Sequence, residues 1–152
     1  MAAAYERPDD PSAEGAKPAP STRRLREQTQ IDFELEFFGR VLERDPLYTE
    51  ALRVHANNLA SKGQHARALQ VDRRLVRLLP ERSIPWYNLA CSFAVLGMLD
   101  PAFGALQQAL DLGYHHADHL RRDPDLKPLR GDARFDRMIR LAYARAAEHD
   151  TP

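Results

Sequence analysis

The chain has 152 residues and balances 22 lysines and arginines against 22 aspartates and glutamates, so its formal net charge is zero. This length predicts a single domain with its own core. The neutral balance gives no overall field that would attract nucleic acid or a membrane surface. The only cysteine, Cys91, excludes an intramolecular disulfide and fits a reducing compartment.

The first 21 residues are rich in proline and offer few large apolar side chains beyond Tyr5. Ordering this segment would cost backbone entropy without burying surface in return, so residues 1–21 are expected to form a disordered tail. The segment lacks the apolar centre of a secretion signal, and no run in the chain reaches the roughly 20 apolar residues of a membrane span. We therefore expect a cytoplasmic protein without membrane contacts.

A helix is expected over residues 22–46. Ser21 can cap it, Ile31, Leu35 and Phe38 recur at helical spacing, and Pro46 ends it. Shifted by one repeat, this helix matches the second half of each helix pair that follows. We interpret it as the helix that caps the N-terminal end of a stack, because an end repeat has no neighbour to cover it.

Residues 49–82 and 83–114 are two copies of one pattern of two helices and a turn. A shift of about 34 residues places large residues on large ones, small on small and glycine on glycine, in the pairs Leu52/Trp86, Ala56/Ala90, Leu59/Phe93, Gly63/Gly97, Ala68/Ala102 and Val76/Leu110. A period of this length, built of two helices, predicts a helical solenoid.

The second copy resembles the tetratricopeptide repeat (TPR) family. The resemblance rests on Trp86 opening the first helix, Ala90 one turn later, Gly97 at the turn, and Ala102 and Ala109 in the second helix. It implies an all-α, right-handed solenoid of helical hairpins with about two full repeats. It also implies a non-catalytic scaffold or adaptor that binds another protein or a peptide, without a cofactor.

Residues 115–148 do not continue the repeat. The sequence DPDLKPLRGDARF, beginning at Asp123, resembles the closing segment that follows the last repeat in many bacterial TPR proteins. That resemblance implies that Leu126, Leu129 and Phe135 fold back on the last helix pair. Phe135, Met138, Ile139 and Ala142 share one face of the expected final helix, which would cover the end of the stack. Residues 22–148 are therefore expected to form one domain.

In TPR proteins the first helix of each repeat lines a concave groove, which gives the candidate partner-binding residues Arg53, Asn57, Ser61, Tyr87, Asn88, Cys91 and Arg122. Arg53, Asn57 and Asn88 match the spacing with which co-chaperone members hold a C-terminal carboxylate, and a guanidinium with amide donors suits that group. Asp118, at another position of such a clamp, would repel it. A carboxylate or an acidic segment is one expected ligand, and any extended or helical segment is another. The alternative function is a self-associating structural module, whose groove holds another copy or the chain's own tail. The chain is expected to be a monomer or a weak homo-oligomer.

Asp72 occupies a position that is usually large and apolar in the family. Either it is buried and accepts a hydrogen bond from His55, Trp86 or an arginine, or its helix is rotated so that Asp72 is exposed.

His115, His116 and His119 lie near acidic residues, and His115 and His119 would form an i, i+4 pair on a helix. Such a pair can bind zinc, but the glutamate of the metalloprotease motif is missing, so a polar connector is the preferred interpretation and no metal is expected. Cys91 lacks a histidine and acid partner at a motif spacing. The chain is not expected to be an enzyme.

Basic residues cluster between Arg121 and Arg145, and Arg134, Arg137 and Arg145 share one side of the expected final helix. Aromatic residues that could stack on bases are not interleaved with them, so a solvated face is expected and no nucleic-acid partner.

Overall fold

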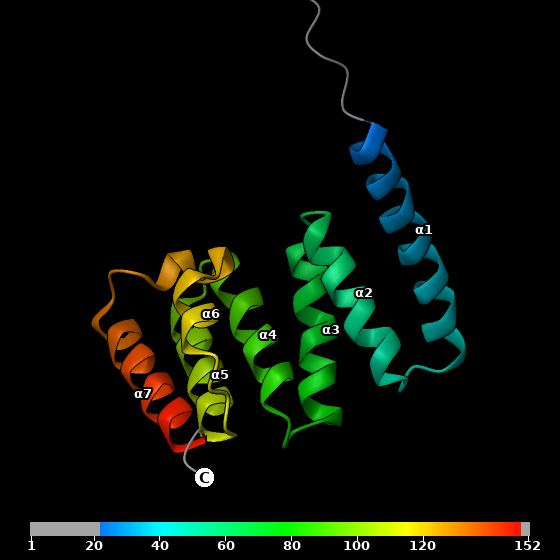
Figure 1. Cartoon of the computed structure of the whole chain (residues 1–152). Helices are drawn as coiled ribbons and strands as arrows, with labels where there is room; N and C mark the ends of the chain where they lie inside the picture. Colours follow the sequence, from blue (N-terminus) through cyan, green and yellow to red (C-terminus); the bar gives the residue numbers. More distant parts are fainter. Residues whose placement is uncertain (1–21, 150–152) are drawn as a thin grey trace, which may run out of the picture.

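The computed structural model describes the backbone of residues 22–149 and the side chains of residues 30–149. The described residues contain no strand; they form α1 (Thr22–Arg44), α2 (Thr49–Ser61), α3 (His65–Leu78), α4 (Ser83–Val95), α5 (Leu99–Asp111), α6 (Ala117–Arg122), the 3-10 helix η2 (Pro124–Leu129) and α7 (Ala133–His149). The helices follow one another in a row from α1 at one end to α7 at the other (Figure 1). The predicted all-α solenoid is confirmed. None of the described helices is long and apolar enough to cross a membrane.

Each full repeat is a helical hairpin, α2–α3 and α4–α5, and both hairpins turn in the same way. Gly63 and Gly97 follow the last residues of α2 and α4 with φ of 74° and 73°. Their N–H groups bond to the carbonyls of Ala60 and Ala94 at 2.9 Å in both cases, so otherwise free helix-end carbonyls are satisfied. The glycines that the sequence aligns therefore make the same turn.

Replacing Gly97 by alanine is expected to destabilise the protein by about 1–2 kcal/mol, because a Cβ disfavours the left-handed backbone that this turn requires. Gly104 provides the matched control, since it lies inside α5 with no atom within 4 Å of an added Cβ. Gly104→Ala should stabilise the protein by up to about 1 kcal/mol through better helix propensity. Thermal unfolding of both variants tests this, and equal shifts in Tm would contradict it.

Small and large residues alternate in the core as the repeat pattern predicts. Ala56, Ala68, Ala90 and Ala102 are buried, which lets the helices of each hairpin approach closely, while buried leucines fill the layers between hairpins. The small residues that the sequence aligns are therefore all buried.

α1 packs against α2 and ends at Arg44, two residues before the expected end of the helix. Two polar contacts join them: Asn58 Nδ2 donates to Glu34 Oε2 at 2.9 Å, and Lys62 Nζ lies 2.7 Å from Asp32 Oδ1. α1 therefore covers α2 at the N-terminal end of the stack. The expected tail, residues 1–21, lies outside the described residues.

The closing segment consists of α6, η2 and α7. Asp123 caps the helix that Pro124 begins: its Oδ1 accepts a 3.0 Å hydrogen bond from the N–H of Asp125. Asp100, which also precedes a proline, does not cap α5 in this way, because α5 begins at Leu99 with no side-chain cap. Asp100 instead pairs with Arg134 Nη1 of α7 at 2.7 Å.

Apolar residues of the closing segment bury the end of the stack. Leu120, Leu126 and Leu129 are fully buried, and Phe135, Met138 and Ala142 of α7 face the core while Ile139 is partly buried. η2 packs against α4 and α7 packs against α5. The predicted fold-back of this segment is present.

Candidate functional site

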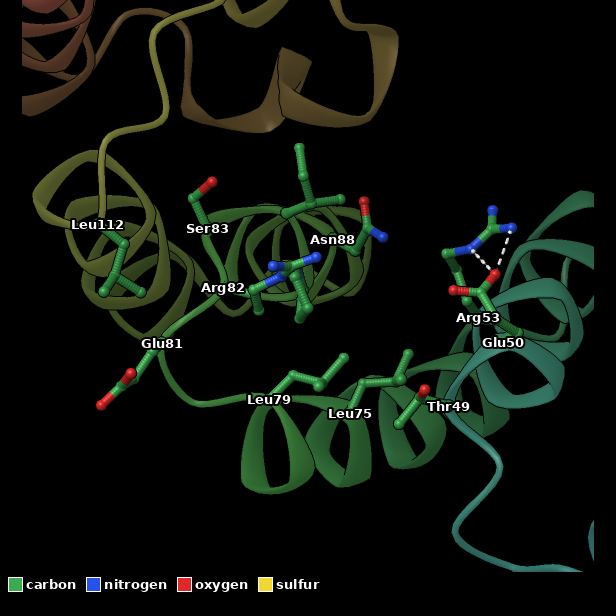
Figure 2. A pocket seen from close by; sticks show the side chains of 12 residues that line it. Thr49, Glu50, Arg53, Leu75, Leu79, Glu81, Arg82, Ser83, Asn88 and Leu112 are labelled. Atoms are coloured by element: carbon green, nitrogen blue, oxygen red, sulfur yellow. Dashed lines mark hydrogen bonds and ion pairs between the residues drawn. The ribbon is translucent and has the colours of Figure 1, made fainter.

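A cavity of about 450 Å³ lies between the start of α2, the end of α3 and the start of α4. Figure 2 shows Leu75 and Leu79 of α3 on one side, Asn88 of α4 on the other, and the Glu50–Arg53 pair at one end. Its volume is in the range of sites for small ligands or peptide side chains. We call it the first cavity.

A second cavity of about 150 Å³ shares the lining residue Asn88 with the first, so the two adjoin. Polar and ionisable side chains dominate its lining, which brings together Ala56, Asn57 and Ala60 of α2, His65 and Asp72 of α3, Tyr87, Asn88, Cys91, Ser92 and Val95 of α4, His119 of α6, and Asp123 and Asp125 at η2. The lining, all within the described residues, contains no lysine or arginine. We call this the acidic cavity, and the two cavities together the groove.

Two predicted groove residues are less accessible than expected. Tyr87 is 4% and Cys91 8% exposed, because the closing segment covers this part of α4. The Tyr87 hydroxyl donates to Asp123 Oδ2 at 2.6 Å, and its ring stacks on Tyr114 with centroids 4.4 Å apart. Burial raises the pKa of both Tyr87 and Cys91, so the hydroxyl and the thiol stay protonated. They form the wall of the acidic cavity rather than an exposed contact surface.

The other predicted residues divide between the cavities. Arg53 lines the first, Asn57 the acidic cavity, and Ser61 an adjoining hollow that shares Asn57 with it. The guanidinium of Arg53 binds Glu50 Oε2 through two hydrogen bonds of 3.1 and 2.9 Å. Arg122 is exposed on α6 and lines none of these cavities.

Asp118, at the other position of the expected clamp, accepts a 2.6 Å hydrogen bond from the hydroxyl of Tyr143. Both the expected α6 contributions therefore lie away from the groove. The structure brings Arg53, Asn57 and Asn88 to one groove. The other two positions of the expected carboxylate clamp do not line this groove, so the clamp is incomplete.

Asp72 is buried, with 4% of its surface exposed, so the alternative of a solvated carboxylate is wrong. The expected donors are also wrong: Ser92 Oγ of the next repeat donates to Asp72 Oδ2 at 2.6 Å. Trp86 Nε1 bonds the Pro80 carbonyl instead at 2.8 Å, and His55 Nδ1 is buried without a partner among the described residues. Burial raises the pKa of Asp72 to about 6, against the lowering effect of the Ser92 hydrogen bond.

The sequence reasoning missed Asp123, Asp125 and His65 as parts of the site. Cys91, Asp123 and Asp125 each offer a ligand atom within 4.8 Å of the others, a spacing that one metal ion could bridge. No local pattern in the sequence places Asp123 and Asp125 beside α4.

The histidine cluster is arranged differently from the expected helical pair. α6 begins at Ala117, so His115 precedes the helix, and its Nδ1 lies 3.0 Å from the Gly113 carbonyl. Its ring stacks on that of His149, while His119 Nε2 lies 3.4 Å from Asp123 Oδ2. All three histidines line one open hollow at the start of α6, and of the three His119 also belongs to the acidic cavity.

Of the three arginines expected to share one side of α7, two are engaged by acidic residues of the chain. Arg134 binds Asp132 and Asp100 and lies over the Phe103 ring, and Arg145 Nη2 lies 3.6 Å from Asp111 Oδ1. This side of α7 is held against α5, which leaves Arg137 as its exposed member.

The fold defines the class of protein, a TPR-like helical solenoid. The solved structure of the MamA RS-1 ArsTM double mutant has the same fold, with a TM-score of 0.59 and 19% identity over 84% of this chain and 72% of that one. A chloroplastic protein of Arabidopsis thaliana is 37% identical over 60 residues, which are 40% of this chain. The match spans 18% of the length of that protein. No family model matches the chain.

Proposed function

We propose that the protein is a non-catalytic interaction scaffold that binds a segment of another protein in the groove. The observation that carries this proposal is the pair of adjoining cavities across α2, α3 and α4, where the polar side chains of Arg53, Asn57 and Asn88 are collected on rigid helices. Backbone groups of an extended segment need such donors and acceptors, and the apolar Leu79 and Ile84, the latter 46% exposed, supply the area for its side chains.

At the first cavity we propose an acidic group of the partner, a C-terminal carboxylate or a side chain. Arg53 and Arg82 both line this cavity, and arginine suits a carboxylate through two parallel hydrogen bonds. The partner would compete with Glu50 for Arg53. Displacing Glu50 costs little free energy, because the Glu50–Arg53 pair is exposed and contributes little to stability.

A scaffold fits the chemistry of this site better than an enzyme does. Cys91 is the obvious nucleophile, but burial raises the pKa of its thiol and nearby Asp123 and Asp125 raise it further. A protonated, covered thiol is a poor nucleophile.

Replacing Arg53, Asn57 and Asn88 together by alanine is expected to remove one bound protein selectively from a lysate pull-down, and to weaken the binding of that purified protein at least tenfold in calorimetry. The matched control carries Gln70→Ala and Arg137→Ala, which change exposed polar residues outside the cavities. A synthetic peptide of the partner, with its C-terminus as acid or as amide, tests the carboxylate. Unchanged binding by the triple variant would overturn the groove proposal.

Self-association is a second candidate, because one surface of α1 is unusually apolar. Phe33 is 66% and Phe37 49% exposed, their rings stack at 6.1 Å, and Leu47 and Tyr48 are exposed in the following loop. Exposed apolar groups gathered in this way are typical of protein contact surfaces. Sedimentation of wild type and of the Phe33→Ser, Phe37→Ser variant tests it: a mass that rises with concentration only in wild type supports self-association, and monomers in both exclude it.

A further inference from the structure

We propose that the acidic cavity binds the cationic side chain, lysine or arginine, of the partner segment that lies in the groove. This inference rests on the proposed function and adds to it a charge that the partner must carry. The partner would thus be a segment with an acidic group at the first cavity and a basic one at the acidic cavity.

Among the described residues, the acidic cavity is lined by three carboxylates and by no lysine or arginine, and the basic side chains in its lining are those of His65 and His119. The carboxylates are those of Asp72, Asp123 and Asp125. None of the ion pairs among the described residues includes Asp72 or Asp125, and Asp123 has only His119, 3.4 Å away. Asp72 is buried with a neutral hydroxyl as its hydrogen-bond donor. A buried carboxylate without a cation costs free energy, so a cation that enters the cavity binds favourably by removing that cost.

The electrostatic state of the neighbouring groups agrees with this geometry. Partial burial first, and then the charge of Asp123, raises the pKa of Asp125, while the charge of His65 lowers it. The pKa of Cys91 is raised by burial and by Asp123, Asp125 and Asp72 together. The surroundings of these groups therefore disfavour negative charge. An incoming ammonium or guanidinium would offset this effect, because its positive charge favours the ionised carboxylates.

Size and access favour a single side chain as the occupant. About 150 Å³ is below the roughly 300 Å³ of the smallest usual small-molecule sites. Asn88 lies where the two cavities of the groove meet, and Asn57 lies where the acidic cavity meets the adjoining hollow. Their amide oxygens can accept hydrogen bonds from a cation. The Tyr87 ring, fixed by Tyr114 and Asp123, gives the cavity a rigid wall.

A metal ion is the competing occupant, and its donor atoms are less well prepared. Asp123 Oδ1 already accepts from the Asp125 N–H and Asp123 Oδ2 from the Tyr87 hydroxyl. Cys91 would have to lose its proton, although burial raises the pKa of its thiol. A side chain that donates hydrogen bonds needs neither change.

The test uses the full chain and a phage-displayed library of random dodecapeptides, selected on wild type and counter-selected on the Arg53, Asn57 and Asn88 alanine variant. We expect the selected peptides to share a lysine or arginine at one position. A selected peptide should bind about tenfold more weakly when that residue is replaced by norleucine, and about tenfold more weakly to Asp125→Asn. The two changes combined should lose no more than either alone.

Asp136→Asn is the matched control, since it removes the same charge from an exposed site on α7 and should bind as wild type does. Groove-dependent peptides without a basic position would overturn the cavity proposal and leave the groove proposal standing. Failure to select any groove-dependent peptide would overturn both. Binding of Zn²⁺ alone, with thiolate absorbance that is lost in Cys91→Ser, would show a metal site instead.

Discussion

Leu126→Ala is expected to lower the free energy of unfolding by about 3 kcal/mol, because Leu126 is fully buried and the truncation leaves a cavity between η2 and α4. That is a large part of the roughly 5–15 kcal/mol that stabilises an ordinary domain. Urea unfolding followed by circular dichroism measures it. Lys127→Ala is the control, since its side chain is exposed on the same 3-10 helix.

The same variant should expose the thiol of Cys91, which the closing segment covers. Local detachment of η2 costs less than global unfolding, so a destabilised η2 opens more often. The reaction of Cys91 with Ellman's reagent is therefore expected to be at least tenfold faster in Leu126→Ala than in Lys127→Ala. Equal rates in both variants would show that η2 does not protect this part of α4.

Asp72→Asn is expected to stabilise the protein at pH 7.5 by about 2 kcal/mol. The pKa of Asp72 in the folded state is about 6, above the ordinary 3.8. The folded protein therefore holds this proton more tightly, and the stabilisation it provides is complete below about pH 4 and is lost as the pH rises through 6. Asparagine avoids burying the charge and keeps a carbonyl to accept from Ser92.

Unfolding at several pH values between 4 and 8 tests this expectation. The free energy of unfolding of wild type should fall between pH 4 and pH 8. For Asp72→Asn it should fall less, and the difference should be about the 2 kcal/mol expected at pH 7.5. Asp136→Asn should follow wild type, because its carboxylate is exposed. Parallel curves for wild type and Asp72→Asn would show that Asp72 does not carry a buried charge. A gain in stability would also fit a residue kept for binding, since functional sites often retain costly groups.

The repeat pattern predicted the hairpins because it depends on local geometry. Gly63 and Gly97 fix the turns, and the alanines set the distance between the helices of a hairpin. These requirements are met within each repeat, so they are visible at a fixed spacing in the sequence.

The candidate site was less predictable because its contacts join distant residues. Tyr87 meets Asp123 across 36 positions, and Ser92 of one repeat reaches Asp72 of the other across 20. Residues with helical spacing indicated which face of α4 points to the groove, but not that η2 would cover it. The burial of Tyr87 and Cys91 and the composition of the acidic cavity both follow from that single packing contact.

η2 also sets the reach of the groove. It packs on α4, and no further full repeat follows α5 among the described residues. The groove is therefore lined by the first helices of two full repeats, α2 and α4. Neighbouring helices are spaced by about 10 Å, and an extended chain advances about 3.3 Å per residue. Two such steps accommodate about six residues. By ending the groove after two repeats, the closing segment would limit the length of the partner segment that fits, in addition to the limit that its charges set.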